Sequence, residues 1–352
     1  MMRVKLKDIT NYSKGSQINR DILLENGKYI YLNGGINPSG KWNAYNVSSK
    51  TITISEGGNS SGYINYITEP FWCGAHCYYL FDGPKNTKYL YYALKSQQER
   101  LFKIRSGACM PNIKKKDLGN FEFEFDFNEK IQIKIVSILD ECNKTINNYK
   151  LELELLDELV KARFVELFGD PVYNEKQWKV EQFGSLGELK RGKSKHRPRN
   201  DPILLGGKYP LIQTGDISNS HTYIQTYKST YSEEGLKQSK MWKAGTLCIT
   251  IAANIAESAI LTFDACFPDS VVGFLPNDKV NSIFIHHWLN FLQPILEENA
   301  PAVAQKNLNV ATLEKVGVIL PPLKLQNQFA NFVKEVDKSR FIIKSMIKEG
   351  LL

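Results

Sequence analysis

A segment of forty residues without proline or glycine, from Glu129 to Phe168, constrains the fold more than any other feature of this chain. Apolar residues recur along it at alternating steps of four and three, namely Ile135, Leu139, Cys142, Ile146, Tyr149, Leu153, Leu156 and Val160. This spacing predicts one long helix with a narrow apolar seam, which suits a helical partner. Gly169-Asp170-Pro171 predicts the end of that helix.

The predicted helix is too long to lie along one compact domain. Forty residues span roughly 60 Å, whereas a domain of ~125 residues is only about 28 Å across. A second helix is predicted from residue 323 onward, because Pro321-Pro322 is followed by the same seam, at Leu325, Phe329, Phe332, Val336, Ile343 and Met346 or Ile347. We expect the two helices to pair with each other. The alternative is that each packs on its own globular part.

The chain repeats itself once, at an offset that drifts from 177 residues (Val4 against Glu181) to 195 (Asn112 against Asn307). Three blocks match in the same order: 4–15 with 181–192, 28–35 with 208–215, and 112–123 with 307–318. Their apolar, basic and glycine positions are in register. Such self-similarity predicts an internal duplication, and the drift is typical of loop insertions.

The globular parts between the helices read as mixed α and β, so we predict an α+β fold with a pseudo-twofold internal repeat. The predicted division is 1–127 for the first domain, 128–169 for the central helix, 170–322 for the second domain and 323–352 for the distal helix. Strands are predicted at 51–55, 63–67, 247–251 and 258–263, and helices at 86–95 and 280–292.

Composition restricts the class of protein. Apolar residues make up 42% and charged residues 23%, values of an ordinary globular protein. Six cysteines in 352 residues are too few for a disulfide framework, and the first residues show no apolar leader, so we expect a cytoplasmic protein. The most apolar window, 247–263, is too short for a membrane helix and carries Asn254 and Glu257, so no membrane partner is expected.

The strongest local charge is a basic stretch in the second half. Between residues 190 and 199 the sequence has six cations and no carboxylate: Lys190, Arg191, Lys193, Lys195, Arg197 and Arg199. Phosphate backbones attract such a cluster because each neutralised phosphate releases counterions. Lys114-Lys115-Lys116 beside Asn112, and Lys306 beside Asn307, are smaller cationic groups at corresponding places of the two halves, which favours nucleic acid as the ligand. The alternative is a solvated basic loop without a partner.

An enzymatic alternative lies in the same stretch. Gly187 to Ser194 satisfies the phosphate-loop pattern G-x-x-x-x-G-K-[ST], which would make the chain a nucleotide hydrolase. A true phosphate loop leads into a helix whose N-terminal amides bind the anion. Here Pro198 and Pro202 follow, and they forbid a long helix.

One segment offers metal-binding side chains. Cys73, His76 and Cys77 lie within five residues of one another, but a structural zinc site needs four ligands and no second cluster of suitable spacing follows. A buried strand with small thiols is the favoured interpretation, so we predict neither a metal nor a cofactor.

Four segments, in this order along the chain, resemble the specificity subunit of type I restriction-modification systems. Phe71–Cys77 is similar to a strand segment often seen in the recognition domains of that family, and Phe164–Pro171 to the end of its central helix. Trp178–Ser194 looks like the opening of a target recognition domain. Leu320-Pro-Pro-Leu, continuing to Ala330, is similar to the beginning of the family's distal conserved helix. The resemblance covers essentially the whole chain.

The resemblance implies a non-catalytic subunit that reads double-stranded DNA. In that family each of two target recognition domains reads one half of a bipartite target, and the two conserved helices pair as an antiparallel coiled coil that fixes the gap between the half-sites. It also implies two methyltransferase subunits and an ATP-driven restriction and translocase subunit as partners. Two departures are visible: 123–129 lacks the family's Pro-Pro, and the second helix is shorter than the first by about ten residues. A dimer of the chain is an alternative assembly.

The candidate DNA-binding residues follow charge and position. Phosphate contacts are predicted for Lys190, Arg191, Lys193, Arg197 and Arg199, and at related places for Lys14, Lys114, Lys115 and Lys306. Contacts to bases or backbone are predicted for Asn33, Gln213, Asn112 and Asn307.

Overall fold

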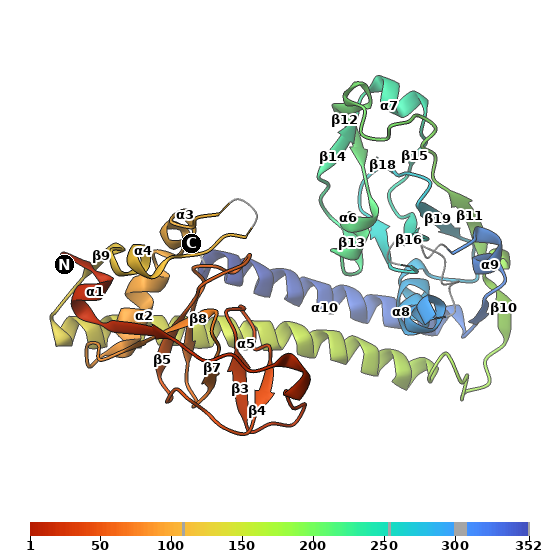
Figure 1. Ribbon diagram of the computed structural model, residues 1–352. Coiled ribbons are helices and arrows are strands. Elements are labelled where there is room, and N and C mark those ends of the chain that lie inside the picture. Colours follow the sequence, from red (N-terminus) through yellow and green to blue (C-terminus); the bar gives the residue numbers. More distant parts are fainter. Residues whose placement is uncertain (108–109, 253–254, 299–307, 351–352) are drawn as a thin grey trace. The chain divides into compact units, whose positions relative to one another are not determined.

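The computed structural model describes residues 1–107, 110–252, 255–298 and 308–350. The chain divides into two compact units, Met1–Thr145 (unit 1) and Ile146–Leu352 (unit 2). Each unit combines small sheets with short helices and part of the long helical segments (Figure 1).

Unit 1 contains three small sheets. Its strands are β1 (Met2–Lys5), β2 (Asn11–Lys14), β3 (Tyr29–Leu32), β4 (Gly40–Trp42), β5 (Thr51–Ser55), β6 (Ile64–Ile67), β7 (Trp72–Cys73), β8 (Cys77–Phe81) and β9 (Glu122–Phe125). Its helices are α1 (Leu6–Ile9), η1 (Arg20–Ile22), α2 (Thr87–Lys95), α3 (Gln98–Lys103) and α4 (Lys115–Gly119). The strand orders are β1-β9, β2-β8-β5-β6 and β4-β3-β7.

Unit 2 contains three sheets of the same kind. Its strands are β10 (Val180–Gln182), β11 (Gly187–Arg191), β12 (Leu205–Leu211), β13 (Tyr223–Ile224), β14 (Ser229–Tyr231), β15 (Met241–Trp242), β16 (Leu247–Thr250), β17 (Ser258–Leu261), β18 (Ala265–Cys266), β19 (Val271–Pro276) and β20 (Gly317–Ile319). Its short helices are η2 (Phe183–Ser185), η3 (Pro202–Leu204), α6 (Thr214–Ser218), α7 (Glu233–Lys237), α8 (Ser282–Glu298) and α9 (Val310–Glu314). The strand orders are β10-β20, β11-β19-β16-β17-β13 and β14-β12-β18-β15.

The strand orders confirm the internal repeat. The series β2-β8-β5-β6 corresponds to β11-β19-β16-β17, and β4-β3-β7 corresponds to β14-β12-β18. The pairing directions agree as well, because β3 and β7 are parallel, as are β12 and β18, while the neighbouring pairs are antiparallel. Unit 2 extends two of its sheets by one strand each, β13 and β15.

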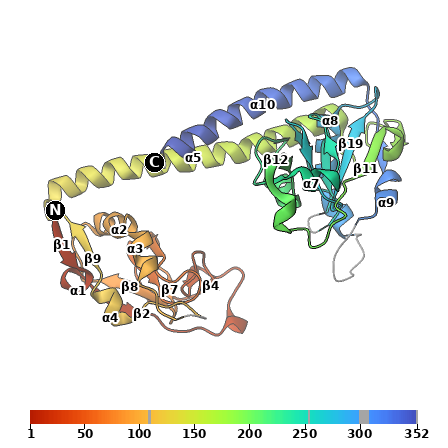
Figure 2. The ribbon, with the colours of Figure 1, turned by 90° about the horizontal axis from the view of Figure 1, so that it is seen from above.

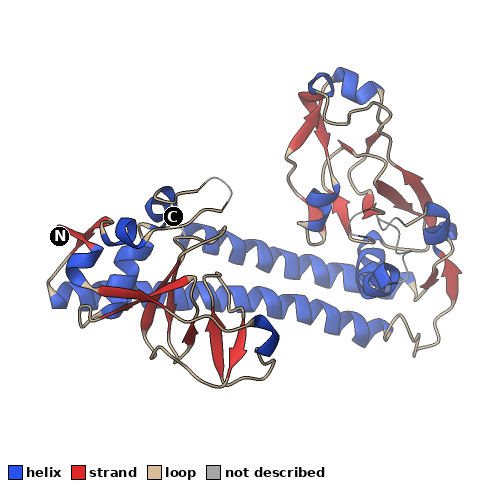
Figure 3. Cartoon of the chain, in the orientation of Figure 1, coloured by secondary structure: helices blue, strands red, loops and turns tan. Residues whose placement is uncertain are grey.

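The predicted strands and helices of both halves are present, with ends shifted by a few residues. The predicted strands form β5, β6, β16 and β17, and the predicted helices form α2 and α8. All residues of β5 and β16 are buried, because both strands lie inside their sheets with another layer against them. In unit 2, α8 packs against β17 and α10. Figure 3 distinguishes the helices from the strands of the chain.

Two long helices follow the globular parts, as predicted: α5 (Glu129–Phe168) and α10 (Leu323–Gly350). The side-chain oxygen of Asn128 accepts hydrogen bonds from the backbone N–H of Lys130 and Ile131, at 3.0 and 3.3 Å. This cap begins α5 where the Pro-Pro of the family pattern is missing. At the other end Gly169 has a φ of +76°, the left-handed conformation that ends a helix at low cost.

A buried glutamine lies in the first turn of each long helix. Gln132 Nε2 donates to the carbonyl of Asp126 at 2.7 Å. Gln326 Nε2 donates to the carbonyls of Pro321 and Lys279, at 2.8 and 3.1 Å, and its Oε1 accepts from Asn281 N at 2.9 Å. Both glutamines tie the beginning of the helix to the chain that precedes it, and Gln326 also ties α10 to the segment before α8.

Within unit 2, α10 lies alongside the last part of α5 (Figures 1 and 2). The rings of Phe164 and Phe329 meet at a centroid distance of 5.4 Å. Asp157, two turns earlier on α5, forms an ion pair with Arg340, three turns later on α10, at 2.8 Å. The helices therefore run antiparallel, and their supercoiling as a coiled coil stays a prediction.

The residues of the two heptad seams are not buried to the same extent. On α10 the seam residues Phe329, Val336 and Ile343 are buried as predicted. Arg340, which lies between the last two, is also buried and brings a charge into the seam. On α5, Cys142 is exposed although the pattern places it in the seam. Among the helices of the described part of the chain, none has both the length and the apolar character of a membrane span.

Candidate nucleic-acid interface

The basic stretch of unit 2 consists of the end of β11 and the loop that follows it, residues 192–201, here called the basic loop. Lys190 and Arg191 are exposed on β11, and Lys190 pairs with Glu188. The chain then turns at Gly192, where a Cβ atom would lie 2.3 Å from the carbonyl oxygen of Pro268. Only glycine allows this approach, so the base of the basic loop is fixed against the segment between β18 and β19.

One residue, Asp269, contacts three of the predicted cations. Asp269 Oδ1 pairs with Arg199 Nη2 at 2.5 Å, and its Oδ2 lies 3.4 Å from Arg197 Nη2. The backbone carbonyl of Asp269 accepts from Arg191 Nε. Arg197 also donates to the carbonyls of Ser194 and His196, at 2.6 and 2.8 Å. These guanidinium groups are thus held in place and remain about half exposed.

Other side chains hold the backbone of the basic loop. Gln238 Oε1 accepts from the N–H groups of Lys195 and His196 at 2.7 and 3.1 Å, and Ser239 Oγ donates to the carbonyl of Lys193 at 3.0 Å. His196 Nε2 lies 2.8 Å from the Asp201 carboxylate. The pKa of Asp201 is lowered by its hydrogen bond from Ile203 N–H and by His196. The basic loop is therefore ordered by its own unit before any ligand binds.

Lys240 belongs to the same cationic surface, although it lies outside the basic stretch that the sequence indicated. Its ammonium lies 3.9 Å from the centroid of the Trp242 ring, a cation–π contact. Burial lowers the pKa of Lys240, and the nearby charges of Lys190 and Lys193 lower it further. These three lysines therefore lie close enough to repel one another, and a polyanion would relieve that repulsion. The local sequence Lys-Met-Trp has no pattern that could have predicted the place of Lys240 beside the basic stretch.

Gln213, predicted to contact DNA, is exposed at the beginning of α6. Its side chain accepts from the backbone N–H of Asp216, while the Asp216 carboxylate accepts from Gln213 N at 2.9 Å. This reciprocal capping box gives the Gln213 side chain a structural role.

The predicted residues near β2 in unit 1 are engaged by their own unit. Lys14 forms an ion pair with Glu56, which also lies 3.4 Å from His76 Nδ1. Asn33 Oδ1 accepts from His76 N, and Asn33 Nδ2 donates to Gln17 Oε1, both at 3.2 Å. Asn33 therefore holds a loop together, which its sequence position did not indicate.

A second predicted group of unit 1 lies before and within α4. Asn112 exchanges two backbone hydrogen bonds of 2.8 Å with Ser106. Lys114 and Lys115 follow at the beginning of α4 with exposed side chains, and the Lys115 ammonium lies 5.8 Å from the Tyr12 ring centroid. The equivalent residues of the second half, Lys306 and Asn307, lie outside the described residues.

The structure contradicts the phosphate-loop alternative. Gly187–Arg191 forms β11, and the basic loop that follows has no helix; the next regular element is the short η3. Without a helix N-terminus there are no aligned N–H groups to hold a nucleotide phosphate. The motif matches by sequence alone.

Cys73 and Cys77 are both buried free thiols. The hydrogen bond that the Cys73 thiol donates to Cys77, together with burial, raises the pKa of Cys73, which keeps it protonated. The described residues include no group of three or more His, Cys, Asp or Glu arranged to hold a metal ion.

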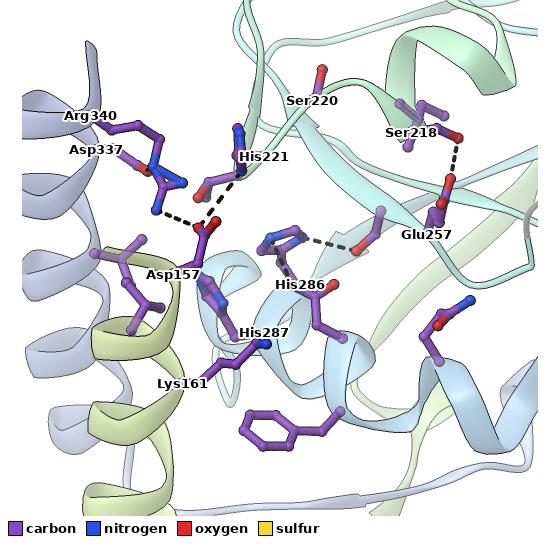
Figure 4. Close-up of a pocket in the computed structure, with 18 of the residues that line it drawn as sticks. Asp157, Lys161, Ser218, Ser220, His221, Glu257, His286, His287, Asp337 and Arg340 are labelled. Carbon is purple, nitrogen blue, oxygen red and sulfur yellow. Dashed lines mark hydrogen bonds and ion pairs between the residues drawn. The ribbon is translucent and has the colours of Figure 1, made fainter. Parts of the chain in front are cut away.

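A cavity of about 590 Å³ in unit 2 lies between α5, α8, α10 and the segment from α6 to β13 (Figure 4). On its wall Asp157 faces both Arg340, at 2.8 Å, and His221 Nδ1, at 3.9 Å. His286 Nδ1 lies 3.0 Å from Ser258 Oγ. Burial lowers the pKa of His286 to about 4, so its ring is neutral at pH 7. None of the described candidate residues for DNA binding lines this cavity.

Comparisons with known proteins agree with this architecture. A family model described as the type I restriction modification DNA specificity domain matches residues 1–156 and 175–352. A curated protein of Mycoplasma genitalium, named for a type I specificity subunit, is 30% identical over 219 residues, which are 60% of this chain and 57% of that protein. The chain thus spans less than two thirds of the length of that relative.

Solved structures show the same fold. The crystal structure of the S subunit of a type I restriction-modification system from M. genitalium aligns with a TM-score of 0.64 and 21% identity, over 99% of this chain and 92% of that one. A structure described for the complex assembly of a type I restriction-modification system aligns with a TM-score of 0.58 and 13% identity, over 99% and 94%. From the family match over both halves, the chain belongs to the type I restriction modification DNA specificity family.

Proposed function

We propose that this chain is the DNA-reading subunit of a type I restriction-modification complex. Its two target recognition domains, 1–127 and 170–322, each read one half of a bipartite target, and the helices 128–169 and 323–352 set the distance between the half-sites. The match of the family model to both halves carries this proposal. The chain itself is proposed to be non-catalytic, to need no cofactor and to work in the cytoplasm.

The proposed contacts to phosphates come from Lys190, Arg191, Lys193, Arg197 and Arg199, joined by Lys240. Exposed cations on a pre-ordered loop support this assignment, because little side-chain entropy is lost when they bind. In the first half, Lys14, Lys114 and Lys115 are proposed to contribute. Asn112 and Gln213 stay candidates for base or backbone contacts.

The proposed partners are two methyltransferase subunits and a restriction and translocase subunit. Exposed apolar side chains on both long helices of unit 2 support docking of a protein partner there: Leu151, Leu155 and Leu159 on α5, and Phe341, Ile342 and Met346 on α10. Such stripes are unfavourable in water and mark interaction surfaces.

The deciding experiment is a map of modified bases in the genomic DNA of a host that carries the neighbouring methyltransferase gene. We expect a split motif, two short blocks around a fixed unspecified gap, that vanishes when this gene is deleted and returns when it is restored. A map that does not change on deletion would contradict the proposal.

A binding measurement tests the basic loop. Replacing both Arg197 and Arg199 by alanine should weaken binding of the full chain to all DNA sequences, and it should flatten the dependence of log K on log salt by about 0.9 for each lost phosphate contact. Fluorescence anisotropy with labelled duplexes at several salt concentrations gives both quantities. Unchanged affinity and slope would remove the basic loop from the interface.

A further inference from the structure

Asp269 lies where a negative charge should be harmful if the surrounding surface binds DNA. It is located between β18 and β19, beside the basic loop, and its side chain is partly exposed. By charge alone it should repel a phosphate backbone. Its contacts indicate a different role.

The carboxylate of Asp269 bridges two arginines that are neighbours in the basic loop. Arg197 and Arg199 reach different oxygens of this one group, and the backbone carbonyl of Asp269 holds Arg191 as well. A guanidinium carries five N–H donors, so a bond to one carboxylate oxygen leaves Arg199 with donors for a phosphate. The cationic charge of the loop still exceeds the single negative charge of Asp269.

The place of Asp269 is itself fixed. Gly192 packs against the carbonyls of Phe267 and Pro268, Gly192 N donates to Val271 O at 2.8 Å, and Val271 N donates to Pro268 O at 3.1 Å. The turn that carries Asp269 is therefore attached to both the end of β11 and the beginning of β19. Because the backbone at Asp269 is fixed, the side chains that Asp269 holds are fixed as well.

We propose that Asp269 is a positioning residue, which holds Arg191, Arg197 and Arg199 in the arrangement that binds the DNA backbone. The inference rests on the proposed function. Exposed ion pairs contribute little to stability by themselves, so the benefit of the carboxylate lies in pre-ordering Arg197 and Arg199, which would otherwise lose entropy on binding. Arg191 is held by the backbone carbonyl of Asp269.

The test is the substitution Asp269→Asn, which keeps the shape of the side chain and removes its charge. We expect DNA affinity to fall about 5- to 10-fold, although the net charge of the chain becomes more positive. Asp269→Glu should recover part of the loss. In the Arg197→Ala, Arg199→Ala background, Asp269→Asn should have little further effect, because the side chains that it positions are gone.

The matched control is Asp264→Asn. Asp264 lies five residues away and also forms an ion pair, with Lys243 at 2.8 Å, and it accepts from Ala244 N at 3.0 Å. It holds none of the three arginines, so its loss should leave DNA affinity unchanged or slightly increased. If Asp269→Asn behaves like Asp264→Asn, the positioning role is wrong and Asp269 merely neutralises charge.

A readout without DNA separates this inference from the proposed function. Hydrogen exchange of residues 192–201 should become faster in Asp269→Asn and not in Asp264→Asn, while exchange in the strands stays the same. Faster exchange in a chain whose wild type does not bind DNA would contradict the proposed function and leave the positioning role intact. Unchanged exchange would overturn the positioning role.

Discussion

The strands β2 and β11 occupy the same place in the two repeats, but the loops that follow them differ. Between β2 and β3 the chain has two cations, Arg20 and Lys28. After β11 the basic loop brings four more cations, and a carboxylate, an amide and a hydroxyl hold the loop in place. The two repeats therefore share the arrangement of their strands, but the loops that follow β2 and β11 differ in charge. Under the proposed function, the two halves therefore read different half-sites and make different numbers of contacts to the DNA backbone.

The long helix α5 shows a similar contrast along its length. Its first part contributes Ile135 and Val136, which are only partly buried against the core of unit 1. Its last part contributes Val160, Phe164 and Phe168, which are fully enclosed in the core of unit 2. The same helix is thus anchored far more strongly at one end than at the other.

The largest effect is expected where that anchor is removed. The Phe164 ring meets those of Phe168, Phe284, Phe291 and Phe329 at centroid distances of 4.8 to 5.7 Å. Phe164→Ala should destabilise unit 2 by about 3–5 kcal/mol, because it leaves a large cavity. Ile135→Ala should cost unit 1 much less. Urea unfolding followed in each unit by hydrogen exchange measures both, and equal losses would contradict the contrast.

The stabilities of the two units should also respond differently to acid. Burial lowers the pKa of His286 to about 4 and that of His287 well below its usual value. Since these folded-state pKa values lie below the unfolded value of about 6.5, the stability that they contribute is complete above pH 6.5 and declines as the pH falls towards the folded pKa. His286 alone contributes a slope of about 1.4 kcal/mol per pH unit over that window.

Unit 1 has a single histidine, His76, and its side chain is exposed. Urea unfolding at pH 6.5 and pH 4.5 should therefore show a loss of about 2 kcal/mol in unit 2 from His286 alone, a further loss from His287, and little change in unit 1. Asp337, whose pKa is raised by burial, opposes part of the loss, because its protonation favours the folded state. His286→Gln should flatten the pH dependence of unit 2. A decline shared equally by both units would speak against this origin.

The smallest effect concerns the two buried glutamines. Gln326→Ala removes three hydrogen bonds and should cost about 2–3 kcal/mol, whereas Gln132→Ala removes one and should cost about 1 kcal/mol. The order of the two unfolding free energies is the informative result. A larger cost at Gln132 would mean that contacts other than these hydrogen bonds set the stability of the helix starts.

Local patterns predicted most of the fold. The helix from 129 to 168, the repeat and the four strands followed from spacing and residue type, which act over short distances along the chain. The phosphate-loop motif also follows a local pattern, and it failed because the helix that it needs is blocked by its prolines.

The candidate site was less accessible from the sequence. The cations of the basic loop were visible as a cluster, but the partners that hold them are far away in the chain: Asp269 is 70 residues from Arg199. The Asn33 side chain is engaged by the backbone N–H of His76, which is 43 residues away. Lys240 is held by its contact with the buried ring of Trp242. Such contacts depend on the tertiary fold and leave no periodicity in the sequence.

Arg340 gives the distal helix a unique longitudinal alignment. An all-aliphatic seam can slip by one helical turn, about 5.4 Å, and still bury equivalent groups. A slip of that size would separate the buried Arg340 guanidinium from the Asp157 carboxylate and so remove one partner of a buried charge, which is unfavourable. The single contact between Asp157 and Arg340 therefore favours one register of α10 on α5 within unit 2, which apolar packing alone would leave open.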